Sequence, residues 1–216
     1  MDNKRQSEYL RSLEKYEDPL LEELRKYACE HDVPIVRRET ESFLRTMVVM
    51  NKPGRILEIG TAIAYSTIVM AQAAGPDAHT DTIESYEKRW APAETNVRRA
   101  GLEDRISLMH GDAGVILKEL VSSCKSYDLI FLDAAKGQYL IWLPDIMKLM
   151  HEGSVLISDN VLQENTVMES RFTVERRDRT THSRMREFLY TIKNHAELET
   201  SVLPLGDGVS ISVKKS

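Results

Sequence analysis

The spacing of apolar residues along the chain changes near residue 52. Up to about residue 51, apolar side chains recur every three or four positions, as they do in Tyr9, Leu13 and Tyr16. This spacing predicts amphipathic helices, and the proline-containing steps at 18–19 and 33–34 predict the breaks between them. The first 51 residues are therefore expected to form a helical N-terminal extension.

From residue 53 onward, short apolar runs alternate with helical patterns. The candidate strands are residues 55–59, 79–84, 105–110, 127–133 and 154–160. The candidate helices between them are residues 64–75, 86–101, 112–124 and 137–150. Strict alternation of this kind predicts a parallel, doubly wound α/β sheet with helices on both faces.

The end of the chain departs from this alternation. A polar segment after Asn160 leads to a predicted helix near 182–195, and two strands follow at 199–205 and 209–215. The tight Gly206-Asp207-Gly208 step between these strands predicts an antiparallel hairpin. We therefore expect one domain, with helices over 1–51 and an α/β core over 53–216. Its seven-stranded sheet is expected to be mostly parallel, with one antiparallel strand.

Composition and charge narrow the class of protein. The 216 residues carry a net charge of -5, so the chain as a whole has no nucleic-acid footprint and any basic surface must be local. Cys29 and Cys124 have no metal-site spacing, which predicts a reduced, cytoplasmic chain without structural zinc. No signal peptide and no membrane-spanning run is expected from the sequence.

Two of the predicted strands end in groups that bind hard cations. Asp133 ends one strand, Asp159 and Asn160 end another, and Lys136 follows the first. If the two strands are neighbours, these oxygen atoms converge on one side of the sheet, where ligands of open α/β sheets bind. Such ligands suit Mg²⁺. The structural alternative is that each residue merely caps the helix that follows it.

The first predicted strand runs into a glycine turn. Gly60 permits a sharp turn and a close approach to a ligand, and the Thr61 and Ser66 hydroxyls are available to polar ligand atoms. The second and third glycines of a dinucleotide fingerprint are missing, which disfavours a pyrophosphate loop. Glu84 ends the next strand, where an acid suits a ribose diol. Asp112 ends the third predicted strand, where it is expected either to contact an adenine or to cap the helix that follows.

These motifs together resemble one enzyme family. The matching segments are Glu58-Ile-Gly-Thr61 with Tyr65-Ser66, Gly111-Asp112-Ala113, Phe131-Leu-Asp-Ala-Ala-Lys136 with Tyr139, and Ser158-Asp-Asn-Val161. They resemble the metal-dependent class I O-methyltransferases, which use S-adenosylmethionine and include catechol and caffeoyl-CoA methyltransferases. The resemblance covers nearly the whole chain beyond about residue 30. It implies a Rossmann-like class I methyltransferase fold. An apolar stripe on the N-terminal helices predicts a homodimer formed through them, to which the resemblance also points, and the alternative is that these helices pack on their own sheet. One departure is Ala64, where the family usually has glycine.

The resemblance also assigns roles to residues. The implied S-adenosylmethionine pocket contains Val36, Glu58, Gly60, Thr61, Ser66, Glu84, Asp112, Ala113 and Asp133. Asp133, Asp159 and Asn160 would hold Mg²⁺, and Lys136 matches the general base of the catechol enzymes. A bound cation lowers the pKa of an acceptor hydroxyl, and three protein ligands leave about three positions for water and substrate. Two adjacent acceptor oxygens are therefore expected. Lys136, with its pKa lowered by the metal and by partial burial, would take the proton.

A basic segment between residues 171 and 186 bears on the substrate. It contains Arg171, Arg176, Arg177, Arg179, Arg184 and Arg186 against Glu175 and Asp178, a net charge of +4. Arginines recognise phosphates, so Arg171, Arg176, Arg177 and Arg179 are candidate tRNA contacts. The segment and the hairpin resemble the bacterial tRNA 5-hydroxyuridine methyltransferases, which act in the anticodon loop. A small-molecule catechol-type enzyme remains the alternative, as does a solvated helix face for the arginines. A redox Rossmann protein is disfavoured by the missing glycines.

Overall fold

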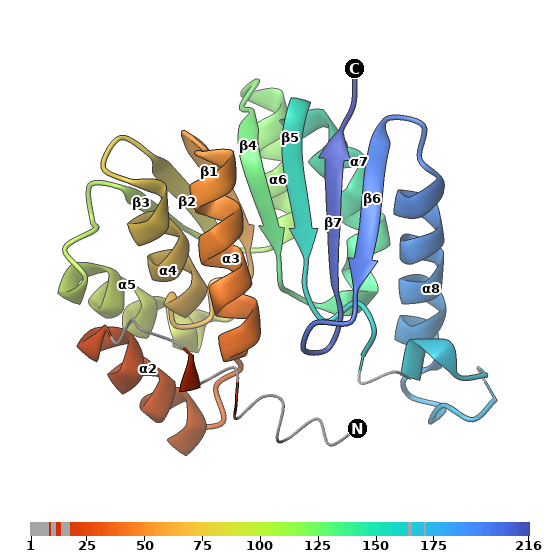
Figure 1. Cartoon of the computed structure of the whole chain (residues 1–216), viewed down its shortest axis with the longest axis horizontal. Coiled ribbons are helices and arrows are strands. Elements are labelled where there is room, and N and C mark those ends of the chain that lie inside the picture. Colours follow the sequence, from red (N-terminus) through yellow and green to blue (C-terminus); the bar gives the residue numbers. More distant parts are fainter. Residues whose placement is uncertain (1–8, 10–11, 14–17, 164–165, 171) are drawn as a thin grey trace.

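A seven-stranded sheet forms the centre of the protein (Figure 1). The computed structural model describes residues 9, 12–13, 18–163, 166–170 and 172–216. The strands are β1 Arg55–Ile59, β2 His79–Glu84, β3 Ile106–His110, β4 Tyr127–Leu132, β5 Met150–Ser158, β6 Leu198–Leu203 and β7 Val209–Lys214. Their order is β3-β2-β1-β4-β5-β7-β6, and β7 alone runs in the direction opposite to the other six strands. The predicted fold class and the closing hairpin are confirmed.

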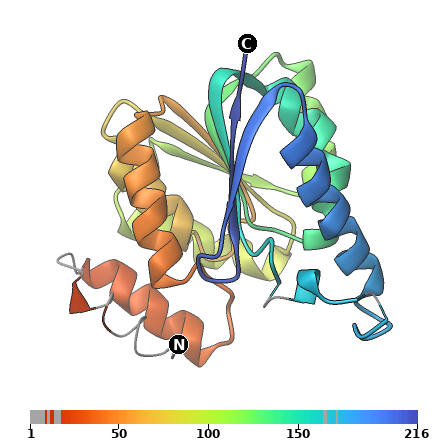
Figure 2. The same cartoon turned by 45° about the vertical axis from the view of Figure 1, so that its right-hand side comes forward.

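Helices cover both faces of the sheet (Figure 2). The α-helices are α2 Pro19–Glu30, α3 Arg38–Asn51, α4 Tyr65–Ala74, α5 Trp90–Arg99, α6 Ala113–Ser122, α7 Tyr139–Leu149 and α8 Arg179–Asn194. Short 3₁₀ turns are η1 Glu87–Arg89, η2 Lys136–Gln138 and η3 Thr166–Met168. Apolar residues of α2 to α5 pack on one face, and those of α6 to α8 pack on the other. A further helix was predicted around Tyr9–Tyr16, and most of its residues lie outside the described ones.

The central strands are apolar because both of their faces are covered. The described side chains of β1 are buried from Ile56 to Ile59, and those of β4 are buried from Leu129 to Leu132. Continuous apolar runs are typical of parallel strands between two helical layers. The edge strand β6 instead alternates between buried and exposed positions over its first four residues, which is the pattern of a sheet with one open face.

The position of the site follows from the strand order. The chain leaves β1 toward α4 on one face and leaves β4 toward α7 on the other, so the two connections diverge and open a crevice. In the register, Ile59 is paired with Leu132, and Leu132 with Ser158. The residues that follow these three are Gly60, Asp133 and Asp159. They therefore lie side by side at one edge of the sheet, where the parallel strands end.

The bounds of β5 and α8 differ from the sequence expectation. β5 begins at Met150, because the pairing with β4 continues across an irregularity between Tyr127 and Leu129. Gly153 has φ +84° there, and a bulge of this kind lets a strand continue through a residue that otherwise reads as a break. The strand ends at Ser158, so Asp159 and Asn160 follow it. α8 begins at Arg179, three residues earlier than expected, and the His182 N–H bonds to the Asp178 carbonyl at 2.9 Å.

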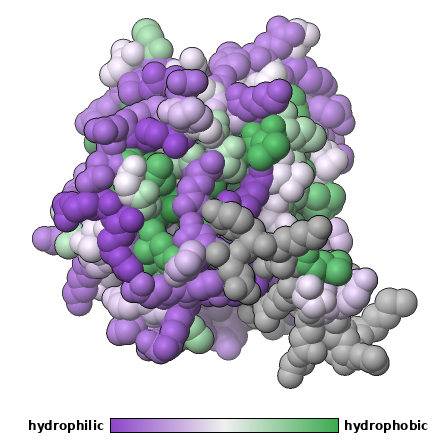
Figure 3. Space-filling view, turned by 60° about the vertical axis from the view of Figure 1, so that its left-hand side comes forward, coloured by the Kyte–Doolittle hydropathy of each residue, from purple (hydrophilic) through white to green (hydrophobic). Residues whose placement is uncertain are grey.

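The predicted homodimer was based on apolar surface of the N-terminal helices. Tyr27 of α2 and Val49 and Met50 of α3 are exposed. Figure 3 shows hydrophobic patches separated by hydrophilic side chains on this side of the molecule. The homodimer stays a prediction. Within the described residues, no helix has both the length and the apolar character needed to cross a bilayer.

Candidate active site

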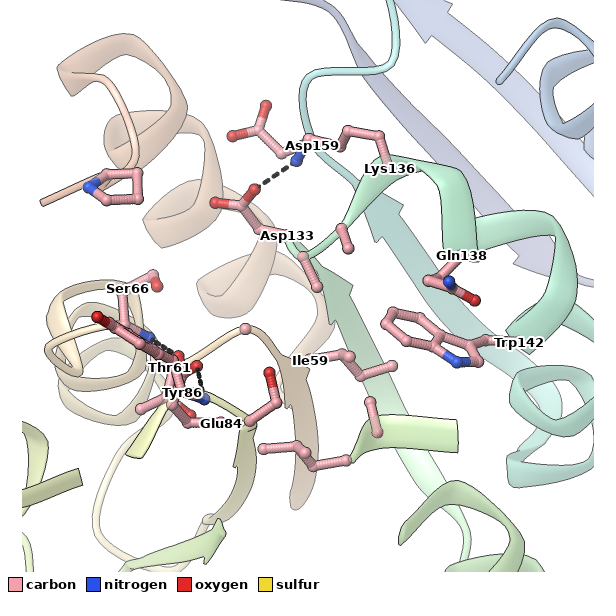
Figure 4. A pocket seen from close by; sticks show the side chains of 18 of the residues that line it. Ile59, Thr61, Ser66, Glu84, Tyr86, Asp133, Lys136, Gln138, Trp142 and Asp159 are labelled. Atoms are coloured by element: carbon pink, nitrogen blue, oxygen red, sulfur yellow. Dashed lines mark hydrogen bonds and ion pairs between the residues drawn. The ribbon is translucent and has the colours of Figure 1, made fainter. Parts of the chain in front are cut away.

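One cavity of about 930 Å³ opens at the carboxyl ends of the parallel strands (Figure 4). Predicted site residues on its wall are Val36, Gly60, Thr61, Ser66, Glu84, Asp112, Ala113, Asp133, Lys136, Asp159 and Asn160. Figure 4 shows Asp133, Lys136 and Asp159 at one end and Glu84, Thr61 and Ser66 at the other. The size is typical of a small-molecule site. The structure therefore brings residues from six separate segments of the sequence to one cavity.

Gly60 forms the sharp turn that the sequence predicted. Its φ is +110°, and a Cβ atom on it would lie 2.0 Å from the carbonyl oxygen of Asp133. Ala62 and Ala64 also have positive φ values, of 48° and 65°, in the left-handed region that disfavours residues other than glycine. The family's usual glycine in place of Ala64 fits this conformation. The Ala62 N–H donates to Glu84 Oε2 at 2.7 Å, which holds the turn in place.

Glu58 is not on the cavity wall, which corrects the expectation from the sequence. Its side chain is fully buried beneath the turn. Ser66 donates to Oε1 of Glu58 at 2.5 Å. Thr82 donates to Oε2 at 2.6 Å, and Thr67 donates to the same oxygen. Burial raises the pKa of Glu58 to about 7, although the three hydroxyl donors act to lower it. Glu58 therefore supports this part of the cavity wall from behind.

The hydroxyl groups of Thr61 and Ser66 are also arranged differently from the expectation. While Glu58 is ionised, Thr82 uses its single hydroxyl hydrogen toward it, so Thr61, 2.6 Å from Thr82 Oγ1, is the donor in that pair. Ser66 likewise donates inward. Both residues line the cavity, but only their oxygen lone pairs remain for a ligand.

We predict that Glu58→Gln flattens the pH dependence of stability. Between the ordinary pKa of 4.5 and the folded pKa of about 7, the folded chain holds a proton that the unfolded chain has lost. The free energy of unfolding therefore falls as pH rises through this window, by up to about 1.4 kcal/mol per pH unit. In urea titrations at pH 5 and pH 7, Glu58→Gln should remove about 2 kcal/mol of the wild-type difference. The exposed Glu103→Gln is the control, and an unchanged difference in Glu58→Gln would contradict the prediction.

Glu84 is fixed by backbone donors. Its Oε1 accepts the Tyr86 N–H at 2.8 Å, and its Oε2 accepts the Ala62 N–H. Each carboxylate oxygen can accept a second hydrogen bond, so the group retains capacity for a pair of hydroxyls. This arrangement fits the predicted ribose contact.

Asp112 caps a helix, which is one of the two alternatives left open by the sequence, and its contact with an adenine stays a prediction. It precedes α6 and accepts the Val115 N–H at 3.1 Å, as a helix N-cap does, and it also lines the cavity. Trp142 of α7 lines the cavity nearby, since a Cβ on Gly114 would lie 3.1 Å from both its Nε1 and Asp112 Oδ1. The sequence analysis missed Trp142, because a single aromatic residue in an apolar helix reads as core.

The neighbours of Lys136 act against the expected lowering of its pKa, which relied on a bound metal as well as on burial. Burial lowers its pKa, but the Tyr139 hydroxyl and the Asp133 carboxylate outweigh burial and raise the value above its usual range. The Nζ atom donates to Asp133 Oδ1 at 2.7 Å and to the Tyr139 hydroxyl at 3.0 Å. Tyr139 in turn donates to the Leu132 carbonyl at 2.9 Å, so the lysine is tied to the end of β4.

Asp159 and Asn160 complete the acidic end of the cavity. Burial and the neighbouring Asp133 carboxylate raise the pKa of Asp159 to about 7. Its Oδ1 accepts the Asn160 N–H at 2.8 Å, and no cationic side chain of the described residues lies within 4 Å of it in an ion pair. No group of three or more His, Cys, Asp or Glu side chains suited to a metal occurs in the described part of the chain. The side chains of Asp133, Asp159 and Asn160 offer two carboxylates and one amide oxygen. Such an all-oxygen set fits a hard divalent cation.

The arginine segment has mixed roles. Arg179 donates to the carbonyls of Val174 and Phe172, and Arg186 donates to the carbonyl of Glu169. These guanidinium groups already bind backbone oxygens, which weakens the expectation that Arg179 contacts phosphate. Arg176 and Arg177 are exposed, and Arg177 pairs with Glu175 and Asp178. Arg171 lies outside the described residues.

Two further residues on the wall were missed. Arg37 and Asp207 form an ion pair of 2.7 Å between the loop before α3 and the β6–β7 hairpin. The sequence analysis used Asp207 only as a turn residue. An acid between two glycines is a common turn signal, so the sequence gives no indication of its partner 170 positions away.

Comparisons with known proteins agree with this site. The family model described as O-methyltransferase matches residues 11–215. A catechol O-methyltransferase of Niastella koreensis is 31% identical over 168 residues, which cover 76% of this chain and 76% of the relative. A caffeoyl-CoA O-methyltransferase of Populus kitakamiensis is 27% identical over 172 residues, covering 78% of this chain and 73% of the relative. The crystal structure of an O-methyltransferase from Bacillus cereus in complex with SAH aligns with a TM-score of 0.87 at 28% identity, over 97% of this chain and 96% of that chain.

Fold, cavity and relatives together define an S-adenosylmethionine-dependent O-methyltransferase. This chain belongs to the O-methyltransferase family.

Proposed function

We propose that the enzyme methylates the 5-hydroxyl of 5-hydroxyuridine at the wobble position of tRNA, with Mg²⁺ held by Asp133, Asp159 and Asn160. The observation that carries the choice of tRNA is the location of the arginine segment. Arg184 of α8 donates to the Gly137 carbonyl at 3.1 Å, and a Cβ on Gly137 would lie 3.5 Å from Thr181 Oγ1. The start of α8 thus packs against η2, the turn that carries Lys136.

Exposed groups just before α8 suit a single-stranded nucleic acid. Phe172 is 84% exposed, and Arg176 and Arg177 are exposed beyond it. Proteins that recognise loop bases in RNA combine aromatic rings, on which bases stack, with cationic groups that contact phosphates. A base flipped out of an anticodon loop would reach the acidic end of the cavity from this side.

The acidic end supports a pair of adjacent acceptor oxygens. A divalent cation supplies a lowered pKa for the acceptor hydroxyl and fixes its direction. 5-Hydroxyuridine presents its O5 hydroxyl beside the O4 carbonyl, which is such a pair. Lys136 has three N–H donors, of which Asp133 and Tyr139 occupy two, so the third is available to an acceptor oxygen. Methyl transfer forms the new O–C bond as the S–C bond breaks, S-adenosylhomocysteine leaves, and the proton of the acceptor hydroxyl passes to solvent water.

A small phenol is the second candidate, favoured by the Niastella koreensis relative, whose printed activity is on catechol. Catechols also present two adjacent oxygens, and Val115, Ile141 and Trp142 give the cavity apolar wall. Incubation with labelled S-adenosylmethionine and either hydroxyuridine-containing tRNA or catechol separates the two. Label transfer to catechol alone would reject the tRNA proposal.

We expect Arg176→Ala/Arg177→Ala to weaken tRNA binding without changing S-adenosylmethionine affinity. Each charge-assisted contact to phosphate contributes about 1.5 kcal/mol, or about tenfold in affinity. The log–log salt dependence of binding should also become shallower by about 0.7 to 0.9 per lost contact. Filter binding at several salt concentrations measures both quantities.

The control is Lys26→Ala/Arg98→Ala, which removes two exposed cations of α2 and α5 that pair with Glu30 and Glu103. It lowers the net charge equally, so a general charge effect would give the same loss in both double variants. Equal tRNA binding by the Arg176→Ala/Arg177→Ala variant and the wild type would favour the small-molecule substrate.

A further inference from the structure

Asp207 lies at the tip of the β6–β7 hairpin, where three parts of the chain meet. Its Oδ2 accepts Arg37 NH2 at 2.7 Å and Asn160 Nδ2 at 3.4 Å. The side chain is 17% exposed and belongs to the cavity wall. The hairpin thereby contacts the residue that follows Asp159 and the loop that closes the cavity near Val36.

The backbone holds this hairpin tip in place. The Leu162 N–H donates to the Asp207 carbonyl at 2.9 Å, and the Val161 N–H donates to the Gly208 carbonyl at 2.9 Å. A Cβ on Gly208 would lie 2.3 Å from Leu162 Cγ, so only glycine permits this close approach. The carboxylate of Asp207 is therefore presented to Asn160 by a preorganised turn.

This contact determines which atom of the Asn160 amide faces Asp207. An ionised carboxylate accepts hydrogen bonds and donates none, so the nitrogen of the amide must be turned toward Asp207. Oδ1 then points away from Asp207. Asn160 itself is held with φ +54°, a conformation that asparagine tolerates better than most residues.

We propose that Asp207 is a positioning residue for the divalent-cation site: it orients Asn160 so that the amide oxygen, and not the amide nitrogen, joins Asp133 and Asp159. This inference rests on the cation part of the proposed function. The site then includes the β6–β7 hairpin, whose involvement does not follow from the acidic residues at the strand ends. Partners of this kind, outside the ligand set itself, typically change metal affinity by about 10- to 100-fold when removed.

Binding of Mn²⁺ to the full-length enzyme, followed by electron paramagnetic resonance, tests the proposal without relying on activity. Asp207→Ala should weaken Mn²⁺ binding by about 10- to 100-fold. Asp207→Asn keeps an acceptor oxygen for Asn160 but removes the charge, and it should retain most of the affinity. Arg37→Ala breaks the ion pair, leaves Asp207 facing Asn160, and should bind Mn²⁺ within about threefold of the wild type. Equal losses in Asp207→Ala and Asp207→Asn would show that charge alone acts, and would overturn the proposal.

A double-variant cycle with Asn160→Ala tests whether Asp207 acts through the amide. If it does, adding Asp207→Ala to Asn160→Ala should cause little further loss, because the group being oriented is already missing. Additive losses would overturn the positioning role. Thermal unfolding of each variant checks that the fold is intact. If the wild-type protein binds no Mn²⁺, the cation site itself is rejected. If the wild type binds Mn²⁺ and Asp207→Ala binds it with equal affinity, only the role of Asp207 is rejected.

Discussion

Replacing Asp159 with alanine is expected to lower methyl transfer by about 1000-fold or more. The residue is buried at the acidic end of the cavity, and its carboxylate is the one there that lacks a cationic side chain in an ion pair among the described residues. If it holds a divalent cation, its loss removes a contribution of several kcal/mol to the transition state, and each 1.36 kcal/mol is about tenfold in rate. The measurement is single-turnover methylation, with EDTA-treated wild type expected to show the same loss.

The controls separate chemistry from cofactor binding. S-adenosylmethionine affinity should stay within about threefold in Asp159→Ala, because Glu84 and Ser66, which are the expected cofactor contacts, lie at the other end of the cavity. Asp104→Ala removes a carboxylate from an exposed loop and should leave the rate unchanged. Undiminished methylation by Asp159→Ala, or by the wild type in EDTA, would contradict the cation assignment.

Gly60→Ala is expected to have the largest effect on stability. The φ of +110° is strained for any residue with a Cβ, at a cost of about 1 to 3 kcal/mol. The new Cβ would also lie 2.0 Å from the Asp133 carbonyl oxygen, and backbone atoms cannot move aside as flexible side chains do. Overpacking adds about 1 to 3 kcal/mol, so a total of about 3 kcal/mol or more is expected in urea unfolding. Displacement of Asp133 should lower activity as well.

Gly75→Ala is the matched control for this prediction. Gly75 also has a positive φ, of +86°, but a Cβ there would meet nothing within 4 Å. It should show only the backbone cost of about 1 to 3 kcal/mol. If the two variants lose equal stability, the contact between Gly60 and the end of β4 is less tight than the structure indicates.

The sequence predicted the sheet well because its central strands are mostly apolar. The bounds of β1 and β2 match the expectation at both ends, since Gly60 and the residues around Gly75 break the pattern clearly. β5 was mispredicted at its start, because the strand passes through Gly153 by a bulge. Bulges are set by the pairing with a neighbouring strand, which local sequence does not specify.

The sequence predicted the kind of site more accurately than the position of each residue in it. Asp133 and Asp159 were expected to meet, and the structure brings them together at one end of the cavity. Glu58 was expected on the wall and is buried beneath it. Side chains of β1 point alternately to the two faces of the sheet, and that of Glu58 points into the protein. The hydroxyl donors around it, Ser66, Thr67 and Thr82, come from neighbouring elements and are seen only in the folded structure.

By itself, the sequence determined the order of strands and helices, the glycine turn after β1, and the polar groups that end each strand. These features depend on local periodicity and on residues next to one another in the chain. The tertiary structure alone decided the contacts between distant segments: the raised pKa of Lys136, the inward-facing hydroxyls, and the Asp207 contacts with Arg37 and Asn160. Hydrogen bonds and charges act over a few ångströms in space, so their partners become known only when the folded chain brings those atoms together.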